Sequence, residues 1–397
     1  MWMYVFTDVV KMARSQLRVL NICESKIGKS IELGMISGSY GAICMAIPLF
    51  KRSFKYQTEA LKMKEEFNDQ WGIAQSYQFI GYYYKWTGSY ATALDYLNRS
   101  ELTFQKIGDI HEAALVRAGI GDIEYYLSNY YSSKSAYDEY LQTSIRIKDD
   151  YGISAAYMCS MQYLYERGDY NDAVDYGMKS HAISREKNIL FVLCEVNIQL
   201  GVVFLEKGDV DNALSYLAQA RDLYEKNNFL KQYTVMVYPF LALALIQEFN
   251  AGKDALSRSE TRVKLLKIKR ACALALKKTR PWTTHYGIAL RAQALYYALV
   301  NRNRKAETFF HESIEHNDRL GRRYEIARSL LDYGSFLDAT GKADQARRRW
   351  GSARRIFAEI GARVYAQKSA DLLGDNEEDS TISQRFMDRQ RLSSVIK

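Results

Sequence analysis

A repeat of about forty residues runs through most of this chain and constrains its fold more than any other feature. One column of the repeat holds residues that favour turns, and these are 40 positions apart: Pro48, Gly88, Ser128, Gly168 and Gly208, and later Asn301 and Gly341. The 93 residues from Gly208 to Asn301 exceed two periods by 13, which indicates an insertion. Repeats of this size form solenoids, in which each unit buries its apolar face against the next.

Two further columns contain small residues and predict close crossings between helices. Seven positions before each turn stand Gly41, Gly81, Gly121, Met161, Gly201, Ala294 and Gly334, and five positions after it stand Ser53, Ala93, Ser133, Ala173, Ala213, Ala306 and Ala346. A glycine inside a helix costs about 1 kcal/mol relative to alanine, so its return at one phase indicates that another helix packs there. Bulky residues such as Leu97, Leu217 and Trp350 occupy neighbouring columns. We therefore expect most of these glycines to be buried where two antiparallel helices cross.

The segment from Leu200 to Leu214 resembles a tetratricopeptide repeat (TPR), with Leu-Gly, aromatic, Gly-Asp and alanine markers in order, and the stretch from Tyr333 to Ala353 matches as well. The period here is 40 residues, whereas 34 is usual in the family. Long repeats of this type are similar to those of large bacterial multidomain signalling kinases with an ATPase module, and of regulators like the maltose-regulon activator. The resemblance implies an all-α fold, a right-handed α-solenoid of about eight helix-turn-helix repeats.

The repeat phase divides the chain into three parts. Residues 1–28 hold a partial repeat with its second helix only, and residues 29–370 hold the solenoid, including an irregular repeat at 229–281. Pro239 falls inside an expected first helix of that repeat, so we expect a kink or a shifted helix start. Residues 371–397 comprise an acidic linker and the start of a helix with Ile382, Phe386, Leu392, Val395 and Ile396 at roughly helical spacing. This tail resembles the connecting helix before sensory domains of the large kinases, and a frayed amphipathic tail is the alternative.

Cysteine usage and hydropathy indicate a cytoplasmic protein. The five cysteines are odd in number and lack Cys-x-x-Cys spacing, which supports neither a disulfide framework nor a zinc site. The N-terminus does not show the basic and apolar segments of a secretion signal. The longest uncharged run, residues 34–50, is shorter than the ~20 apolar residues of a membrane-spanning helix. We therefore expect no membrane partner.

Positive charge gathers toward the C-terminus. Between Arg258 and Lys368 there are 25 Lys and Arg residues against 10 Asp and Glu residues. Runs such as Arg347-Arg348-Arg349 are suited to neutralising phosphates, but no helix-turn-helix motif or aromatic stacking pattern accompanies them. A solvated or domain-docking face is the favoured interpretation, and nucleic acid is an unfavoured partner.

Two apparent chemical motifs fail on their spacing. Gly28-Lys29-Ser30 ends like a phosphate-binding loop, but Cys23 stands where the first glycine is required and no strand precedes it. His311 and His316 approach the pattern of a zinc-protease helix, but histidines five positions apart point to different helix faces. The sequence therefore predicts no catalytic, cofactor-binding or metal-binding residue and no cofactor, and it disfavours a self-contained enzyme.

Binding is predicted for the groove that the first helices line. In the TPR family, residues beside the small column of each first helix face the concave side. Carried over by position, this implies the candidate ligand contacts Gln78, Tyr82, Lys85, Asp122, Tyr125, Gln162, Tyr165 and Glu195. Aromatic and hydrogen-bonding groups in one groove suit the recognition of a peptide or a protein segment. The alternative for each residue is packing against the next repeat.

These observations favour a non-enzymatic protein-interaction and regulatory module of a larger bacterial signal-transduction protein, such as a sensor or a serine/threonine kinase with an ATPase module. The alternative is a stand-alone TPR receptor that binds a signalling peptide in its concave groove. In both interpretations the partner is a protein or a peptide, and other domains of a parent protein are one source of it.

Overall fold

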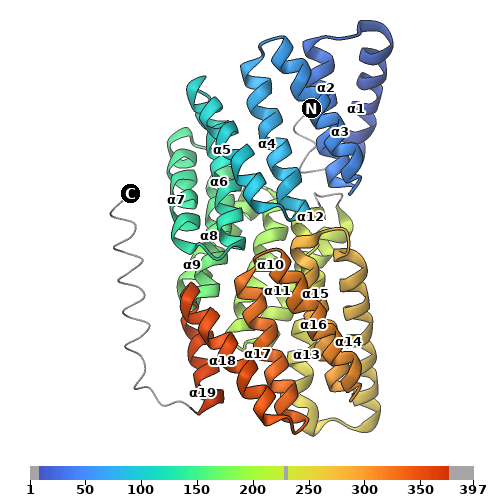
Figure 1. Ribbon diagram of the computed structural model, residues 1–397, viewed down its shortest axis with the longest axis vertical. Coiled ribbons are helices and arrows are strands. Elements are labelled where there is room, and N and C mark those ends of the chain that lie inside the picture. Colours follow the sequence, from blue (N-terminus) through green and yellow to red (C-terminus); the bar gives the residue numbers. More distant parts are fainter. Residues whose placement is uncertain (1–8, 228–230, 375–397) are drawn as a thin grey trace.

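The structure, a computed structural model, describes residues 9–227 and 231–374, and every regular element in these ranges is a helix (Figure 1). Helix α1 (Val9–Ile22) and the π-helical turn η2 (Cys23–Ile27) precede eight antiparallel helix pairs. The pairs are α2 (Ile31–Ala46) with α3 (Phe50–Glu66), α4 (Gln70–Thr87) with α5 (Tyr90–Lys106), α6 (Ile110–Tyr126) with α7 (Tyr130–Ile147), α8 (Asp150–Arg167) with α9 (Tyr170–Glu186), α10 (Leu190–Glu206) with α11 (Val210–Lys226), α13 (Val237–Gly252) with α14 (Arg258–Thr279), α15 (Thr283–Leu299) with α16 (Asn303–Arg319), and α17 (Arg323–Ala339) with α18 (Ala343–Ile360). The short α12 (Lys231–Thr234) and η3 (Lys253–Ala255) flank α13, and α19 (Arg363–Leu373) follows the last pair. The predicted right-handed α-solenoid of about eight TPR-like repeats is confirmed.

The turn column owes its composition to backbone geometry. Turn residues within the pairs adopt the left-handed conformation, with φ of +93° at Gly168 and +62° at Ser128. Glycine and, less readily, short polar residues tolerate this conformation, which closes the C-terminal end of a helix. At the junctions between pairs, Asp69 and Asp109 accept the backbone N–H groups of Gly72 and Glu112 and so cap α4 and α6.

The small column lies at helix crossings, as predicted. Gly81, Gly121, Gly201 and Gly334 are all buried in first helices. A Cβ atom at Gly201 would lie 2.6 Å from Cγ of Leu217, and one at Gly334 would lie 2.5 Å from Cδ1 of Trp350. Each glycine therefore receives a large side chain of the second helix of its own pair.

Met161, which departs from the glycine column, shows the same contact with the two roles exchanged. Its partner on α9 is Gly177, where an added Cβ would lie 2.6 Å from Cε of Met161. The large side chain thus comes from the first helix in this repeat and the small one from the second. The helix crossing stays close because one side of it is always small.

The irregular repeat contains the expected shift in helix start. Pro239 is the third residue of α13, after two turn residues that separate α13 from α12. A proline in the first turn costs no intrahelical hydrogen bond, because N–H groups there have no partner within the helix. The second helix of this repeat, α14, has 22 residues and begins with a capping box of Ser257 and Glu260. Among the described residues, one stretch, 231–255, is long and apolar enough to span a membrane. However, 61% of its most apolar 18-residue segment is buried inside the molecule, as in a core helix.

The superhelix makes a full turn and packs on itself, a feature that the sequence did not predict. Residues about 195 positions apart in the sequence are in contact. Oγ1 of Thr283 donates a hydrogen bond to the carbonyl oxygen of Trp86, 197 positions away, at 3.0 Å. Arg363 pairs with Asp169, 194 positions away. In Figure 1, α15, α17 and α19 accordingly lie below α4, α6 and α8. Part of the turn column lies at the edge that meets the second superhelical turn, since side chains on Gly88 and Gly168 would collide with Leu320 and Val364.

Two further expectations concern the ends and the charge. The N-terminal helices enclose a small separate core that includes Leu20, Ile36 and Tyr40. The predicted connecting helix lies in residues 375–397, outside the described residues.

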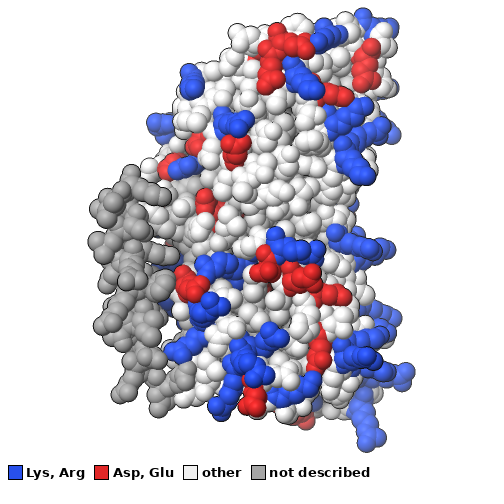
Figure 2. Space-filling model, viewed as in Figure 1, with Lys and Arg blue, Asp and Glu red and all other residues white. Residues whose placement is uncertain are grey.

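Positive charge gathers over the C-terminal helices, as the sequence indicated. Lys and Arg side chains crowd the lower half of the molecule in Figure 2, whereas much of the upper half is uncharged.

Candidate functional site

A cavity lies inside the superhelix, where its two turns face each other. Its volume is about 70 Å³, enough for several water molecules or one inserted side chain. One wall comes from α6, α8 and α10, and the other comes from α13, α15, α17 and the residues beside them. The lining residues are Asp122, Tyr125, Tyr126, Met158, Cys159, Gln162, Tyr165, Glu195, Gln199, Tyr233, Met236, Phe240, His285, Ile288, Arg322 and Glu325.

Glu195 supplies a carboxylate that is not already committed. It projects from α10 and is partly buried, and its side chain forms no hydrogen bond or ion pair with the part of the chain that the structure describes. Burial is the main cause that raises the pKa of Glu195 to about 8, the charge of Asp122 adds to the rise, and Lys85 opposes it. Glu195 is therefore mostly protonated at neutral pH, and a cation entering the cavity would stabilise its ionised form.

Asp122, by contrast, is neutralised by its neighbours. It forms an ion pair with Nζ of Lys85, whose side chain is fully buried, and it accepts a hydrogen bond from the hydroxyl of Tyr137 at 2.9 Å. The ammonium of Lys85 also lies 4.8 Å from the ring centroid of Trp86 and 5.3 Å from that of Tyr233. Cation–π contacts of this kind replace part of the lost hydration. Lys85 thus joins α4 to α6 and to the start of the second superhelical turn.

A cluster of tyrosines around Glu166 fixes the wall formed by α6 and α8. The hydroxyl groups of Tyr125 and Tyr165 are 2.8 Å apart, and Glu166 accepts hydrogen bonds from Tyr125 at 2.7 Å and from Tyr130 at 2.6 Å. Burial raises the pKa of Glu166 to about 8, against the lowering effect of these hydrogen bonds. Because buried networks with satisfied partners are rigid, this wall is a preformed surface.

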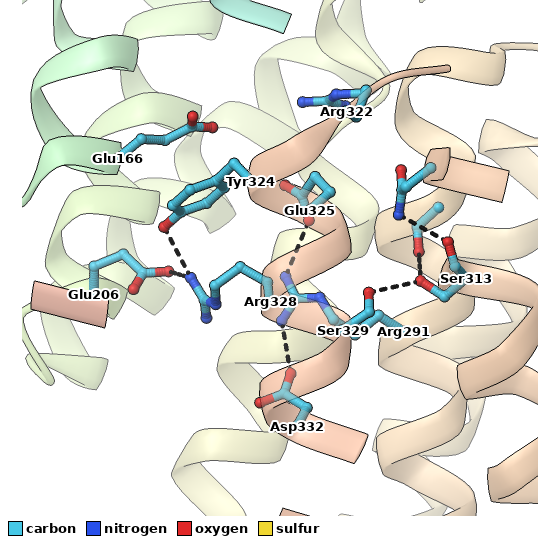
Figure 3. A network of polar contacts seen from close by, with 12 residues as sticks. Glu166, Glu206, Arg291, Ser313, Arg322, Tyr324, Glu325, Arg328, Ser329 and Asp332 are labelled. Carbon is cyan, nitrogen blue, oxygen red and sulfur yellow. Dashed lines mark hydrogen bonds and ion pairs between the residues drawn. The ribbon is translucent and has the colours of Figure 1, made fainter. Parts of the chain in front are cut away.

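The opposite wall carries alternating positive and negative groups (Figure 3). Arg322 donates to the carbonyl oxygen of Thr284, and its guanidinium lies 4.9 Å from the ring centroid of Tyr126. Arg291 lies 3.6 Å from the carboxylate of Glu325 and 2.9 Å from that of Asp332. These contacts hold the junction before α17 against α6 and α15.

A further buried ion pair joins the two superhelical turns below the cavity. Nη1 of Arg328 on α17 lies 2.6 Å from Oε1 of Glu206 at the end of α10, and the hydroxyl of Tyr365 on α19 donates to the same carboxylate. The guanidinium of Arg328 also lies 4.0 Å from the ring centroid of Tyr365. The structure therefore joins helices 120 or more positions apart in the sequence through a largely buried contact.

Several polar atoms at the cavity have unused hydrogen-bonding capacity. Oε1 of Gln199 and Nε of Arg322 are buried and have no hydrogen-bond partner among the described residues. An unmatched buried polar atom costs about 1–3 kcal/mol unless a partner reaches it. The cavity thus offers an acceptor, a donor and the carboxylate of Glu195 to a polar or cationic group. Within the described residues no set of His, Cys, Asp and Glu side chains is placed to hold a metal ion.

The predicted ligand contacts fall into two groups. Asp122, Tyr125, Gln162, Tyr165 and Glu195 line the cavity. Gln78, Tyr82 and Lys85 do not: Gln78 and Lys85 are buried within α4, and the hydroxyl of Tyr82 lies 3.5 Å from the carbonyl oxygen of Leu115 on α6. These three side chains pack against the next repeat, which was the alternative open for each position.

Other lining residues were missed, for two different reasons. Gln199 lies one helical turn after Glu195 on α10, so the repeat pattern would have found it had each column been extended by one turn. Tyr233, His285, Arg322 and Glu325 belong to the second superhelical turn. No local pattern marks them, because they reach the cavity only through closure of the superhelix.

No protein-family model matches this sequence, and a search of curated protein sequences finds no match. Solved structures, however, share its fold. The chain is similar to a Rap protein complexed with competence and sporulation factor, with a TM-score of 0.62 and 13% identity over 92% of this chain and 99% of the other.

Two further solved structures have the same architecture. The Rap conjugation gene regulator of the plasmid pLS20, in complex with the Phr* peptide, matches with a TM-score of 0.60 and 13% identity over 92% of this chain and 97% of that one. The apo form of the quorum sensor NprR from B. thuringiensis matches with a TM-score of 0.54 and 13% identity over 88% and 95%. At these identities the likeness establishes the helical-repeat fold alone.

Proposed function

We propose that this chain is a non-enzymatic regulatory receptor that binds a peptide at the cavity between its two superhelical turns. The observation that carries the proposal is the cavity itself, a partly enclosed site lined from both turns with an uncommitted carboxylate and unmatched polar atoms. The fold is that of proteins described as a gene regulator in complex with a peptide and as a quorum sensor. A bacterial, cytoplasmic setting belongs to this proposal.

The receptor interpretation takes precedence over a module of a larger kinase. The likeness runs over 99% of the Rap chain, so the whole of that chain, and not a part of it, resembles this one. The predicted parentage among large signalling kinases and maltose-regulon-activator-like regulators has no comparable support. The long 40-residue repeat type remains part of the proposal as an interpretation of the sequence.

The chemistry of the cavity suggests a cationic anchor. A volume of about 70 Å³ accepts one side chain and not a whole peptide. Glu195 is the lining carboxylate that has no hydrogen-bond or ion-pair partner among the described residues, while the rings of Tyr126 and Tyr233 provide flat apolar walls. A Lys or Arg side chain, or a peptide amino terminus, would pair with Glu195 and lay its apolar part along these rings. The remaining residues of the peptide would lie outside the cavity, on the inner faces of the first helices.

Display selection of random short peptides on the immobilised full chain tests the proposal, followed by calorimetry of the selected sequences. We expect enrichment of peptides that contain Lys or Arg, and a loss of affinity of about tenfold to a hundredfold in Glu195→Gln, because a charged hydrogen bond is worth about 1.5–3 kcal/mol. Glu186→Gln is the matched control, since Glu186 is exposed at the end of α9. A selection without enrichment, or equal affinity in wild type and Glu195→Gln, would overturn the proposal.

A further inference from the structure

Helix α14 carries an excess of positive charge close to the net charge of the whole chain. Residues 258–279 contain eight Lys and Arg residues and one Glu, which gives +7, whereas the whole chain carries +9. The other 375 residues therefore sum to +2. Charge concentrated on a single 22-residue helix creates a local positive potential that attracts an anionic partner.

The outward face of α14 also exposes apolar side chains. The helix buries Ile268, Cys272 and Ala275 against the solenoid. On the opposite face, Val263 is 67% exposed and Leu266 is 45% exposed. A helix that buries one apolar stripe normally presents a polar face to water, so a second set of apolar residues among the cations indicates a surface used for contact.

Most of the cations of α14 have no anionic partner among the described residues. Within the described residues, Lys264 pairs with Glu248 at 2.8 Å and Lys278 lies over the rings of Tyr224 and Tyr238. The remaining exposed cations of the helix form no ion pair with residues 9–227 or 231–374: Arg258, Arg262, Lys267, Lys269, Arg270 and Lys277. Helix α14 lies at the right-hand edge of the molecule in Figure 1, and Lys and Arg side chains project from the same edge in Figure 2.

We propose that the outer face of α14 binds the surface of an anionic phospholipid bilayer. Long Lys and Arg side chains reach the headgroup phosphates while they stay hydrated, and Val263 and Leu266 enter the boundary with the acyl chains. This is surface binding, and it departs from the expectation of no membrane partner, which was drawn from the search for a membrane-spanning helix and not for a surface-binding one. It uses the outer wall of the solenoid and leaves the central cavity free.

The composition of the face decides against the other anionic partners. A desolvated protein interface is usually poor in lysine and rich in aromatic residues, whereas this face carries Lys267, Lys269 and Lys277 and no aromatic side chain. Nucleic acid would pair with the cations but would have little use for exposed Val263 and Leu266. An anionic bilayer uses both the charges and the apolar side chains.

Sedimentation of the full chain with lipid vesicles tests the proposal. We expect binding to vesicles of phosphatidylcholine with phosphatidylserine, weakening as salt is added, and little binding to phosphatidylcholine alone. Each Lys or Arg near an anionic surface contributes about a fivefold increase in partitioning, so Lys267→Glu/Lys269→Glu/Arg270→Glu should reduce it by a hundredfold or more. The control, Lys51→Glu/Lys62→Glu/Lys106→Glu, changes net charge equally at exposed sites elsewhere and should retain most of the binding.

The apolar residues separate a bilayer from other polyanions. Val263→Ser/Leu266→Ser keeps every charge and should lower vesicle partitioning by about tenfold, with no change in binding to heparin or polyglutamate. Circular dichroism shows whether each variant keeps its helical fold. Absence of binding to phosphatidylserine vesicles, binding unaffected by the α14 charge reversals, or equal loss in both charge variants would overturn the proposal. Binding of polyglutamate as strong as that of vesicles, with no effect of the serine variant, would assign the face to acidic proteins instead.

Discussion

Gly201→Ala tests the helix crossings most directly, because a single methyl group should reverse the usual effect of this substitution. In an open helix, replacing glycine by alanine stabilises by about 0.5–1 kcal/mol. At Gly201 the added Cβ would lie 2.6 Å from Cγ of Leu217 and 3.2 Å from the carbonyl oxygen of Ala213. Carbon atoms in contact prefer about 3.5–4.0 Å, so one helix has to move by about 1 Å.

Overpacking of this kind costs about 1–3 kcal/mol. After the gain in helix propensity is subtracted, we expect Gly201→Ala to lower the free energy of unfolding by about 1–2 kcal/mol. Gly351→Ala is the matched control, since Gly351 lies inside α18 with no atom within 4 Å of an added Cβ. It should stabilise by about 0.5–1 kcal/mol.

A double-mutant cycle tests whether Leu217 is the obstacle. Leu217→Ala alone leaves a void and should cost about 2–5 kcal/mol. In the Gly201→Ala background its cost should be smaller by about 1 kcal/mol, because the new methyl group occupies part of the void. Repeat arrays need not unfold in one step, so urea denaturation should be accompanied by native-state hydrogen exchange of α10. If Gly201→Ala stabilised as much as Gly351→Ala, the crossing described here would be wrong.

Three further predictions concern buried charges. Burial lowers the pKa of Lys64 to about 8, so the folded protein binds this proton less tightly than the unfolded chain does. The free energy of unfolding should therefore rise between about pH 8 and pH 10.5. Lys64→Met should remove that rise and stabilise the protein at pH 7 by roughly 1–3 kcal/mol, as urea titrations at several pH values would show. Burial also lowers the pKa of His285 to about 3, so stability should fall as pH drops from about 6.5 toward 3, and His285→Gln should have a flatter acid limb in the same titrations. Arg328→Met leaves Glu206 buried without its cation and should cost about 3–5 kcal/mol of stability. Arg221→Met, which breaks an exposed pair with Asp222, should cost less than about 1 kcal/mol. Similar losses in thermal and urea melts of the two variants would contradict the buried Arg328–Glu206 ion pair.

The repeat period was enough to predict the local fold. Glycine at one phase and bulky residues 16 positions later are contacts within one helix pair, so Gly201 with Leu217 and Gly334 with Trp350 were accessible from sequence. Met161 looked like a departure from the pattern because its small partner, Gly177, lies on the other helix. A comparison of both columns together would have paired them.

The candidate site was predictable only in part, because it depends on the pitch of the superhelix. Small rotations at each crossing add up over five repeats and bring Trp86 to Thr283. No short motif records that sum, so Arg322 and Glu325 could not be assigned to the cavity. For the same reason the sequence did not show that Lys85, a candidate ligand contact, is buried in an ion pair with Asp122.

Hydrogen exchange of the full chain with and without a selected peptide tests the central claim of a receptor whose ligand binds between the superhelical turns. The account predicts slower exchange in α6, α8 and α10 and around Arg322, which line the cavity from both turns, with α2 and α3 unchanged as internal controls. Glu195→Gln should abolish this protection at the same peptide concentration, while Glu186→Gln should keep it. Protection confined to the outer helices, or the same protection in Glu195→Gln, would contradict the account.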